Sequence, residues 1–542
     1  MQTAVSMRWR ARTALVGSLL LGMVASWLLA AAPVGAATSV TLGTATSATL
    51  GSYLTGPSGH THYWLSSDTA TGATCTGGCL TNWPPLSVSA GATVTAAGVG
   101  GTFTTFTRPD TQALQVAYDG HPLYYFAHDS AAGQTNGAGI AAFGGTWHVA
   151  AVAAGGMTLY VSPTGSSSGA DTSCSTAAYT KINDAVSAAS AGDTVIVCAG
   201  TYKEDVAISR ALTLSGQSAD TTIIDATGLD NGIKIAASNV IVSGFTVENA
   251  TGEGILAQQP NPVKGPMIQG IQLYTGAPIT NVVIGHNTVE NNDQGGLPAN
   301  VATTKYAECQ ASGNVPGDCG EGIHLWSVAN SQVLFNTVTG NSGGILLTDE
   351  FGPTYGNLIA GNIVTDNASD CGITLPGHNL ALNPQTHKLM PSFGGVYDNI
   401  VRSNVVLDNG LLGQGAGILV AAPAPGTASY NNVIEDNAIA GNGLAGVTMH
   451  GHAAGAFIGG NQVLDNIIGP NNMDGDTDVS PTADNAKTGI LVWSAATPIT
   501  VTISGNTIFG DWYGIWMNTT VSALGAAHLN TFQAVSTHVH HA

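Results

Sequence analysis

From about residue 157 onward, short runs of Val, Ile and Leu alternate with polar residues, and Asn and Gly separate the runs every few positions. Alternation with a period of two predicts β-strands that bury one face. Val282, Ile284, Val289 and Ile323 illustrate the pattern, and their side chains are expected to point inward. Because Asn and Gly favour turns, the pattern predicts many short strands.

The pattern repeats along the chain. A six-residue motif (Asn, any residue, Val or Ile, two residues, then Asn or Asp) recurs along the chain, as at Asn287/Asn292, Asn336/Asn341, Asn362/Asn367, Asn404/Asn409, Asn437/Asn442, Asn461/Asn466 and Asn506/Asp511. A Gly followed by Ile or Val accompanies it at Gly232, Gly254, Gly322, Gly344, Gly372, Gly417, Gly446, Gly489 and Gly514. The shortest step, 22 residues from Gly232 to Gly254, suits one coil of a solenoid.

The repeated asparagines are expected at the corners between strands. Asn tolerates left-handed backbone geometry, and its amide both donates and accepts hydrogen bonds. Stacked Asn side chains would therefore bond from coil to coil along the solenoid axis. This interpretation gives the motif a structural role and not a ligand-binding one.

The segment that precedes the coils carries a family resemblance. Residues 159–216, which include GDTVIVCAGTYKEDVAI at 192–208, resemble the opening of the secreted right-handed parallel β-helix superfamily. That superfamily includes pectate lyases, polygalacturonases and pectin methylesterases. With the coils that follow, the resemblance covers about residues 157–530 and implies a right-handed, single-stranded parallel β-helix.

A short helix is expected just ahead of the first full coils, around residues 181–189. Its apolar stripe consists of Ile182, Ala185, Val186 and Ala189. A helix with one buried stripe can cap the open end of a solenoid, whose first coil otherwise exposes its core. At the other end, residues 531–542, with His538, His540 and His541, are expected to form a tail.

Residues 38–155 contain a separate two-copy repeat and are expected to form a small β-rich domain. The copies align Gly59, His60, Tyr63, Leu65, Asp68 and Trp83 with Gly120, His121, Tyr124, Phe126, Asp129 and Trp147. GHPLYYFAHD at Gly120 and WPPL at Trp83 resemble a family of bacterial secreted and lipoprotein repeats with a Tyr-x-aromatic-x-x-Asp motif, over most of residues 46–152. The chain departs from that family at Leu65, where an aromatic residue is usual, and lacks its lipobox Cys.

Two interpretations of this repeat are open, and the family implies no chemistry that would decide between them. The tyrosines and aspartates could form a ligand or metal site with His60, His62, His121 and His128. Alternatively, the tyrosines and tryptophans are core, and Asp68 and Asp129 bind turn amides. The second interpretation is the prediction.

Residues 1–36 are predicted to be a secretory signal peptide. Arg8, Arg10 and Arg12 precede an apolar run from Ala14 to Ala32 that ends in small residues. A membrane anchor is the alternative, because the run is close to spanning length. With the signal removed, the protein is expected to be extracellular and monomeric, with no membrane span.

The chain is acidic, with a formal net charge of −20 that becomes −23 when the three arginines of the signal are removed. Such a charge repels nucleic acid and anionic membranes, so no nucleic-acid partner is expected. It also disfavours a polyanionic sugar unless a cation or local basic groups intervene.

The seven cysteines of an exported chain are expected to form local disulfides. Proximity in sequence predicts the pairs Cys75–Cys79, Cys174–Cys198 and Cys309–Cys319. Cys371 then remains unpaired.

The candidate site is sought where the period stretches, because loops leave the solenoid there, at about 293–320, 377–396 and 470–487. Counted from the Gly of each Gly-Ile or Gly-Val pair, the first and third residues that follow are expected to face inward, and the second and fourth are expected to face solvent. The predicted catalytic residues are Glu321, His324, Asp349, Glu350 and His378. The predicted substrate-binding residues are Trp326, His450, Trp493 and Trp516.

These residue types suit polysaccharide chemistry, since a carboxylate beside a His is an acid/base pair and tryptophans stack on sugar rings. The alternative is a decorated surface on which the loops pack. The catalytic motifs of the superfamily are mostly missing: GTYKE at Gly200 lies in the opening coil, and His450-Gly451-His452 is not the Gly-His-Gly of polygalacturonases. The sequence therefore leaves open whether the protein is an enzyme.

A candidate cation site lies in the third loop. Asp474, Asp476 and Asp478 alternate in DGDTD, and oxygen ligands at alternate positions suit Ca²⁺. The loop departs from the helix-loop-helix calcium pattern at Val479, where a Gly is expected, and a solvated acidic loop is the alternative.

Two hypotheses of function follow. The first is an extracellular carbohydrate-interacting protein, a polysaccharide lyase, hydrolase or epimerase, whose partner is a polysaccharide or cell-surface glycan. The second is a non-catalytic surface or matrix scaffold that uses the N-terminal domain for attachment.

Overall fold

The computed structural model describes residues 40–542 except 48–49, 70–71, 90, 97–98, 153–155, 167–169, 269–270, 275, 293–320, 384–385, 387, 412–414, 472–486 and 526–527. Almost all of its regular structure is strand. The described chain divides into two units, one that extends to Thr158 and includes Ser190–Thr194, and one that holds Leu159–Ala189 and Val195–Ala542. Neither unit contains, in its described residues, a helix long and apolar enough to cross a bilayer.

The N-terminal unit is built from short antiparallel strands, among them β1 (Val40–Ser47), β2 (Gly51–Thr55), β3 (Tyr63–Leu65), β6 (Phe103–Thr107), β7 (Leu114–Tyr118) and β10 (Gly145–Val149), with helix α2 (Cys79–Asn82). The Trp83 and Trp147 rings stack in its core with centroids 3.7 Å apart. Corresponding residues of the two sequence copies thus meet at the centre of the unit.

The Tyr and Asp residues of the repeat are cross-linked between its copies. Tyr63 Oη donates to Asp129 Oδ2 at 2.6 Å, and Tyr124 Oη donates to Asp68 Oδ2 at 2.8 Å. The second oxygen of each carboxylate accepts a turn amide: Asp129 Oδ1 accepts the N–H of Asn136, and Asp68 Oδ1 accepts the N–H of Thr74. The prediction that these residues form the core and its turns is confirmed.

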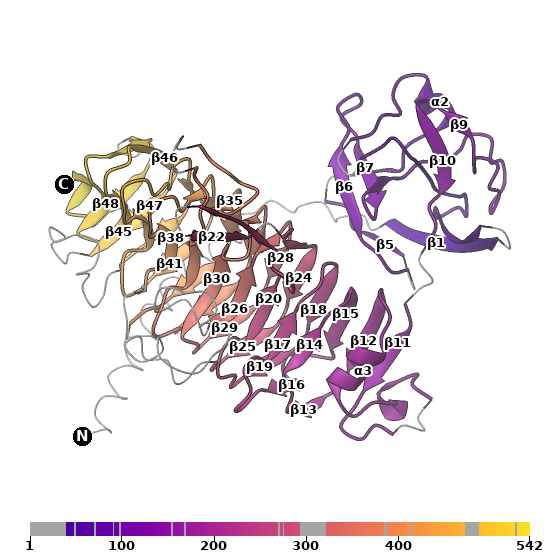
Figure 1. Ribbon diagram of the computed structural model, residues 1–542, viewed down its shortest axis with the longest axis horizontal. Helices are drawn as coiled ribbons and strands as arrows, with labels where there is room; N and C mark the ends of the chain where they lie inside the picture. The colour runs from indigo at the N-terminus through magenta and orange to yellow at the C-terminus, as the bar shows by residue number, and fades with distance from the viewer. Residues whose placement is uncertain are drawn as a thin grey trace. The chain divides into compact units, whose positions relative to one another are not determined.

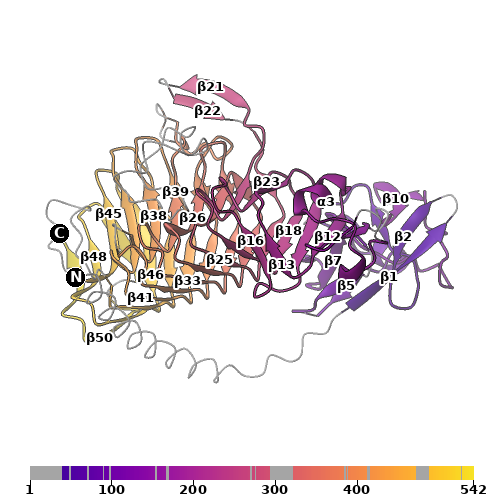
Figure 2. The same ribbon diagram turned by 90° about the horizontal axis from the view of Figure 1, so that it is seen from below.

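The second unit is the predicted right-handed parallel β-helix (Figure 1). A 12-stranded sheet runs from β11 (Thr158–Val161) to β49 (Val521–Leu524), and an 11-stranded sheet runs from β13 (Gly200–Tyr202) to β50 (Thr531–Gln533). A five-stranded sheet from β23 (Ile279–Thr280) to β39 (Ser429–Tyr430) widens the middle coils. The hairpin of β21 (Lys264–Ile268) and β22 (Ile271–Tyr274) stands away from the coils (Figure 2).

The remaining long sheet, called the site sheet below, also has 11 strands. In spatial order they are β14 (Val206–Ile208), β17 (Ile233–Ile235), β20 (Ile255–Gln258), β26 (Glu321–Trp326), β30 (Gly343–Thr348), β34 (Ile373–Pro376), β38 (Ile418–Ala422), β42 (Val447–Gly451), β45 (Thr488–Ser494), β48 (Tyr513–Met517) and β51 (Thr537–His541). Residues 531–542, expected to be a tail, instead carry β50 and β51, which pair in parallel with the preceding coil.

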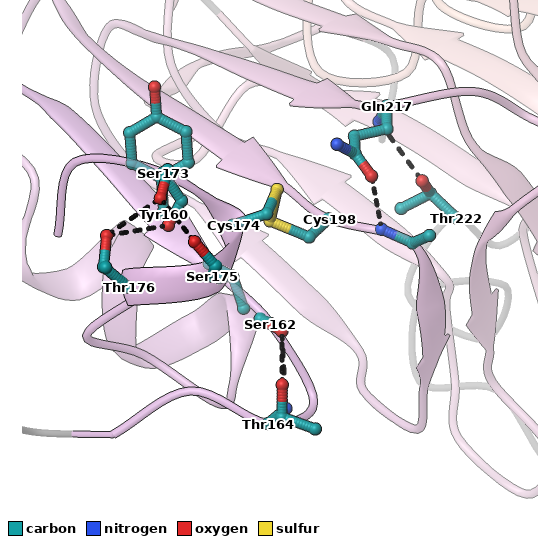
Figure 3. Close-up of a disulfide and its surroundings, with 12 residues drawn as sticks. Tyr160, Ser162, Thr164, Ser173, Cys174, Ser175, Thr176, Cys198, Gln217 and Thr222 are labelled. Atoms are coloured by element: carbon teal, nitrogen blue, oxygen red, sulfur yellow. Dashed lines mark hydrogen bonds between the residues drawn. A yellow bond between two sulfur atoms is a disulfide. The ribbon is translucent and has the colours of Figure 1, made fainter. Parts of the chain in front are cut away.

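The start of the solenoid matches its sequence pattern. Helix α3 (Ile182–Ala188) buries the predicted stripe, which belongs to the same core as the coils. The Cys174–Cys198 disulfide ties the first coils together (Figure 3), and Cys75–Cys79 forms in the N-terminal unit. Both predicted bonds are confirmed, Cys371 is a buried free thiol, and the Cys309–Cys319 pair lies outside the described residues.

The asparagines form hydrogen-bonded ladders along the axis. At Asn404, Nδ2 donates to Asn437 Oδ1 at 3.0 Å and to the Ile359 carbonyl at 2.9 Å, while Oδ1 accepts from both the backbone and the side chain of Asn362. One ladder contains Asn287, Asn336, Asn362, Asn404, Asn437, Asn466, Asn506 and Asn530. A second contains Asn292, Asn341, Asn367, Asn409, Asn442, Asn471 and Asp511.

A third ladder, of Asn357, Asn399, Asn432 and Asn461, was not predicted. It places one copy of the motif in a different register, because Asn461 follows Asn432 while Asn466 follows Asn437. The motif alone could not reveal this shift, since consecutive ladders are five residues apart and any adjacent pair matches it.

The left-handed backbone lies one residue before most ladder positions and not on the ladder asparagines as expected. Ser403, with φ 55°, precedes Asn404, and Asp436, also with φ 55°, precedes Asn437. The left-handed residue turns the chain, and the asparagine that follows can then point its amide into the coil. Left-handed tolerance is therefore required of the neighbour, while the ladder position requires an amide.

Asp511 is the exception that allows a test of the ladder. It is buried, and its Oδ1 accepts from the Asn471 backbone at 2.8 Å. Burial raises its pKa to about 7, and the Asn471 bond and Lys487 offset only part of that effect. Since the folded pKa exceeds the ordinary value, the protonated carboxyl is the form that favours folding.

We expect Asp511→Asn to stabilise the protein in a pH-dependent way. In the parent, the contribution of the Asp511 carboxyl to the free energy of unfolding is fully present below about pH 4. It is lost as the pH rises towards 7, by on the order of 2–4 kcal/mol. The melting temperature of the variant should therefore exceed that of the parent at pH 8, with the difference shrinking towards pH 4. A difference that does not change with pH would count against a charge buried in the ladder.

Candidate functional site

The site sheet separates inward and outward side chains as the Gly-Ile count predicted. On β26, Ile323 and Leu325 belong to the solenoid core, while His324 and Trp326 project from the opposite face. Their exposure was predicted wrongly, since both outward residues are buried. A second layer covers them, in which Trp326 stacks between His324 and Phe351, with ring centroids 5.5 and 4.5 Å apart.

The first polar pair joins neighbouring strands. His324 Nδ1 lies 3.0 Å from Glu253 Oε1, and Glu253 Oε2 accepts the backbone N–H of Glu321 at 2.9 Å. On its other side, His324 Nε2 lies 2.8 Å from Thr348 Oγ1. The imidazole is therefore held at both nitrogens, by residues of the coils on either side of its own.

The second pair continues in the next coils. His378 Nδ1 lies 2.8 Å from Glu350 Oε1, and both side chains are at least nine-tenths buried. Burial alone would raise the pKa of Glu350, but the hydrogen bond and charge of His378, with the charge of His324 and the Thr348 hydroxyl, lower it to about 2. Glu350 is thus ionised, and the hydrogen on His378 Nδ1 points to it.

Thr348 lies between the two pairs. Its hydroxyl is 2.8 Å from His324 Nε2, and it helps to lower the pKa of Glu350. Glu253, His324, Thr348, Glu350 and His378 thus form one row of polar residues, called the relay below. It crosses four successive strands of one sheet, from the loop ahead of β20 to the segment after β34.

Asp349 lies beside the relay but is engaged with the backbone. Its carboxylate accepts the N–H groups of His378 at 2.6 Å, Asn379 at 3.0 Å and Gly395. Burial and the charge of Glu350 raise its pKa to about 7, against the lowering effect of these amides. The side chain therefore fixes both ends of the segment between His378 and Gly395, and so positions His378.

Glu321 lies against the first pair. One ligand atom each from Glu253, Glu321 and His324 lie within 4.8 Å of one another, and the three residues are 4%, 2% and 4% exposed. The structure thus brings all five predicted catalytic residues into one region. Glu253 and Thr348 are the members of the relay that the prediction omitted.

A signal for Glu253 exists in the sequence. Gly-Glu-Gly-Ile occurs at residues 252–255 and again at 320–323, and Ile255 pairs with Ile323 in the sheet. The two glutamates therefore occupy equivalent positions on adjacent coils. The long insertion between these coils hides the equivalence from a search for a regular period.

The predicted substrate-binding residues separate into two groups. Trp326 belongs to the relay region, whereas β42, which carries His450, lies three strands beyond β30, roughly 14 Å at ordinary strand spacing. There His450 Nδ1 lies 3.0 Å from His452 Nε2, and Trp493 meets His452 edge-on. Burial, with the charge of His452, lowers the pKa of His450 to about 3.

Two other predictions have different outcomes. Trp516, expected to be exposed, packs against Leu491 and Tyr513 and is buried. Asp474, Asp476 and Asp478 lie outside the described residues, so Ca²⁺ at that loop stays a prediction.

Two family models match the chain. Residues 104–151 match a secreted repeat of unknown function, and residues 247–472 match a family described as periplasmic copper-binding protein (NosD). Both resemblances expected from the sequence, to the secreted repeat and to the parallel β-helix superfamily, are confirmed. The second match includes the whole relay. No curated protein matches the chain.

Solved structures share the solenoid only loosely. The A-module of mannuronan C-5 epimerase AlgE4 from Azotobacter vinelandii is 16% identical, with a TM-score of 0.40, and the alignment covers 67% of this chain and 93% of that one. An alginate lyase from Paenibacillus is 13% identical with a TM-score of 0.30, covering 71% and 98%. The catalytic domain of a GH87 α-1,3-glucanase is 11% identical with a TM-score of 0.36, covering 89% and 86%. At these values the comparison adds nothing on function.

Proposed function

We propose that the protein is an exported enzyme that removes a proton from a sugar ring of an extracellular polysaccharide, as a lyase or an epimerase. The observation that carries the proposal is the relay, in which a histidine–carboxylate pair faces a second histidine held at both nitrogens. The family descriptions, secreted and periplasmic, support an extracellular or periplasmic location.

His378 acts as the base in this proposal. In the neutral imidazole, Nδ1–H points to the Glu350 carboxylate, and this hydrogen bond selects the tautomer whose lone pair is on Nε2. A base of this kind typically contributes a factor of about 10²–10⁴. Asp349 positions it by holding the backbone of His378 and of Gly395.

His324 supplies positive charge on the other side of the relay. Paired with Glu253 and Thr348, its imidazolium would stabilise the negative charge that develops when the proton leaves carbon. A ring proton is acidic enough for a histidine base only beside a carbonyl or carboxylate group. We therefore propose a uronic acid at the reacting position.

The substrate class is tested with purified protein on a panel of neutral and uronate polysaccharides. New ultraviolet-absorbing unsaturated ends identify a lyase, altered uronate stereochemistry identifies an epimerase, and reducing ends without unsaturation identify a hydrolase. We expect one of the first two, on a uronate polymer, lost in the His324→Ala/Glu350→Gln double variant. Activity that survives both substitutions would remove the relay as the reaction centre.

A scaffold is the second candidate function, and the burial of the relay favours it. Buried polar pairs that join neighbouring coils can align those coils without any reaction. In that case the panel yields no product, and Glu350→Gln lowers the melting temperature by several degrees. The enzyme proposal instead requires product from the parent.

A further inference from the structure

Glu253, Glu321 and His324 form a compact donor set outside the His378 pair. Each offers one oxygen or nitrogen, the three atoms lie within 4.8 Å of one another, and all three residues are buried. Bonds of about 2.0–2.2 Å from one ion to imidazole and carboxylate ligands would place those ligands about 3–4 Å apart. The 3.0 Å separation of His324 Nδ1 from Glu253 Oε1 already has that size.

The repeat itself stacks the two carboxylates. Because Gly-Glu-Gly-Ile recurs on adjacent coils in register, Glu253 and Glu321 occupy neighbouring levels of the same corner. Two carboxylates this close repel when both are ionised, and burial strengthens the repulsion. A divalent cation between them would convert the repulsion into attraction.

The contact with Thr348 indicates which imidazole nitrogen can bind a metal. Thr348 Oγ1 lies 2.8 Å from His324 Nε2 and can accept its N–H, which leaves Nδ1 for a ligand. Nδ1 then faces the Glu253 carboxylate either with a second proton or with a metal ion between them. A histidine that donates its far N–H to a fixed acceptor is the usual arrangement of a metal ligand.

We propose that Glu253, Glu321 and His324 Nδ1 bind one divalent transition-metal ion of the Zn²⁺, Co²⁺ or Cu²⁺ class. One imidazole nitrogen and two carboxylate oxygens suit these ions, whereas Ca²⁺ takes oxygen ligands alone and Cu⁺ prefers sulfur. The role of this metal ion in catalysis rests on the proposed function. The binding of the ion does not. A metal keeps positive charge where the imidazolium would otherwise supply it.

The test uses the full chain without any glycan. The protein is stripped with chelator, dialysed separately against Zn²⁺ and Cu²⁺, and assayed by elemental analysis; Co²⁺ loading is followed by its visible absorption. We expect one tightly bound ion per chain and a raised melting temperature. Glu253→Gln/Glu321→Gln should weaken binding at least 100-fold, and Thr348→Val by about 10- to 100-fold through the lost Nε2–H acceptor.

Two controls separate this site from other donors. Glu290→Gln, on a neighbouring face of the solenoid, should bind as the parent does, and so should a variant that replaces the C-terminal His538, His540 and His541 by Ala. His324→Gln serves as the second site variant if the double variant does not fold. No ion in the parent, or binding that only the C-terminal substitutions remove, would overturn the inference; metal binding without product on the glycan panel would overturn only the proposed function.

Discussion

An Asn404→Leu variant should lose about 2–6 kcal/mol of the free energy of unfolding. The substitution leaves the Ile359 carbonyl and the Asn362 backbone N–H without their partners inside the coil, and each orphaned group costs about 1–3 kcal/mol. Apolar burial by Leu cannot compensate, because the position is surrounded by rungs of the same ladder. Urea midpoints and melting temperatures of the parent and the variant measure the loss.

Gln332→Leu is the matched control for this prediction. It makes a similar polar-to-apolar change on the same solenoid, at an exposed strand position outside the ladders. Its stability should stay within about 0.5 kcal/mol of the parent. Equal stability of all three proteins would contradict the structural role given to the ladders.

His378→Gln should lower the turnover of the polysaccharide substrate by a factor of about 10²–10⁴ while the protein stays folded. Gln can still donate to Glu350, and the backbone N–H that Asp349 accepts is unchanged, so the segment from His378 keeps its anchors. What the variant lacks is a group able to take up a proton. Steady-state kinetics and a melting curve on the same preparation separate the two effects.

His528→Gln serves as the control, since this imidazole is exposed near the end of the solenoid. Its turnover should equal that of the parent. If His378→Gln retains more than a tenth of the parent turnover, the base must be another residue.

The solenoid could be predicted because its determinants are local. A Val or Ile between two asparagines specifies a strand and its corners within six residues, and the superfamily resemblance extends that pattern to the whole unit. The errors arise where two roles assigned to one residue are divided between neighbours. Ser403 adopts the left-handed conformation, and Asn404 supplies the amide. The shifted register at Asn461 arises because the ladders share one spacing.

The site was predicted only in part, because local patterns show the direction of a side chain but not the residues that pack on it. Alternation along β26 shows that His324 points outward, but whether it is exposed depends on its contact with Trp326 of the same strand and on Phe351, which packs on Trp326 from the segment after β30. Glu253 was missing from the predicted site because its contact with Glu321 joins residues 68 positions apart, across a long insertion. Asp349 looked like an acid/base group, although its three backbone amides are visible only in the folded chain.

Proton magnetic resonance of a uronate polysaccharide in heavy water tests the central claim most directly. Removal of the ring proton beside the carboxylate, by lyase or epimerase, erases the signal of that proton as turnover proceeds. The account predicts that the signal is lost with the parent and with His528→Gln, and persists with His378→Gln. Turnover by the parent that leaves this proton in place, or its equal loss with His378→Gln, would contradict proton removal by the relay.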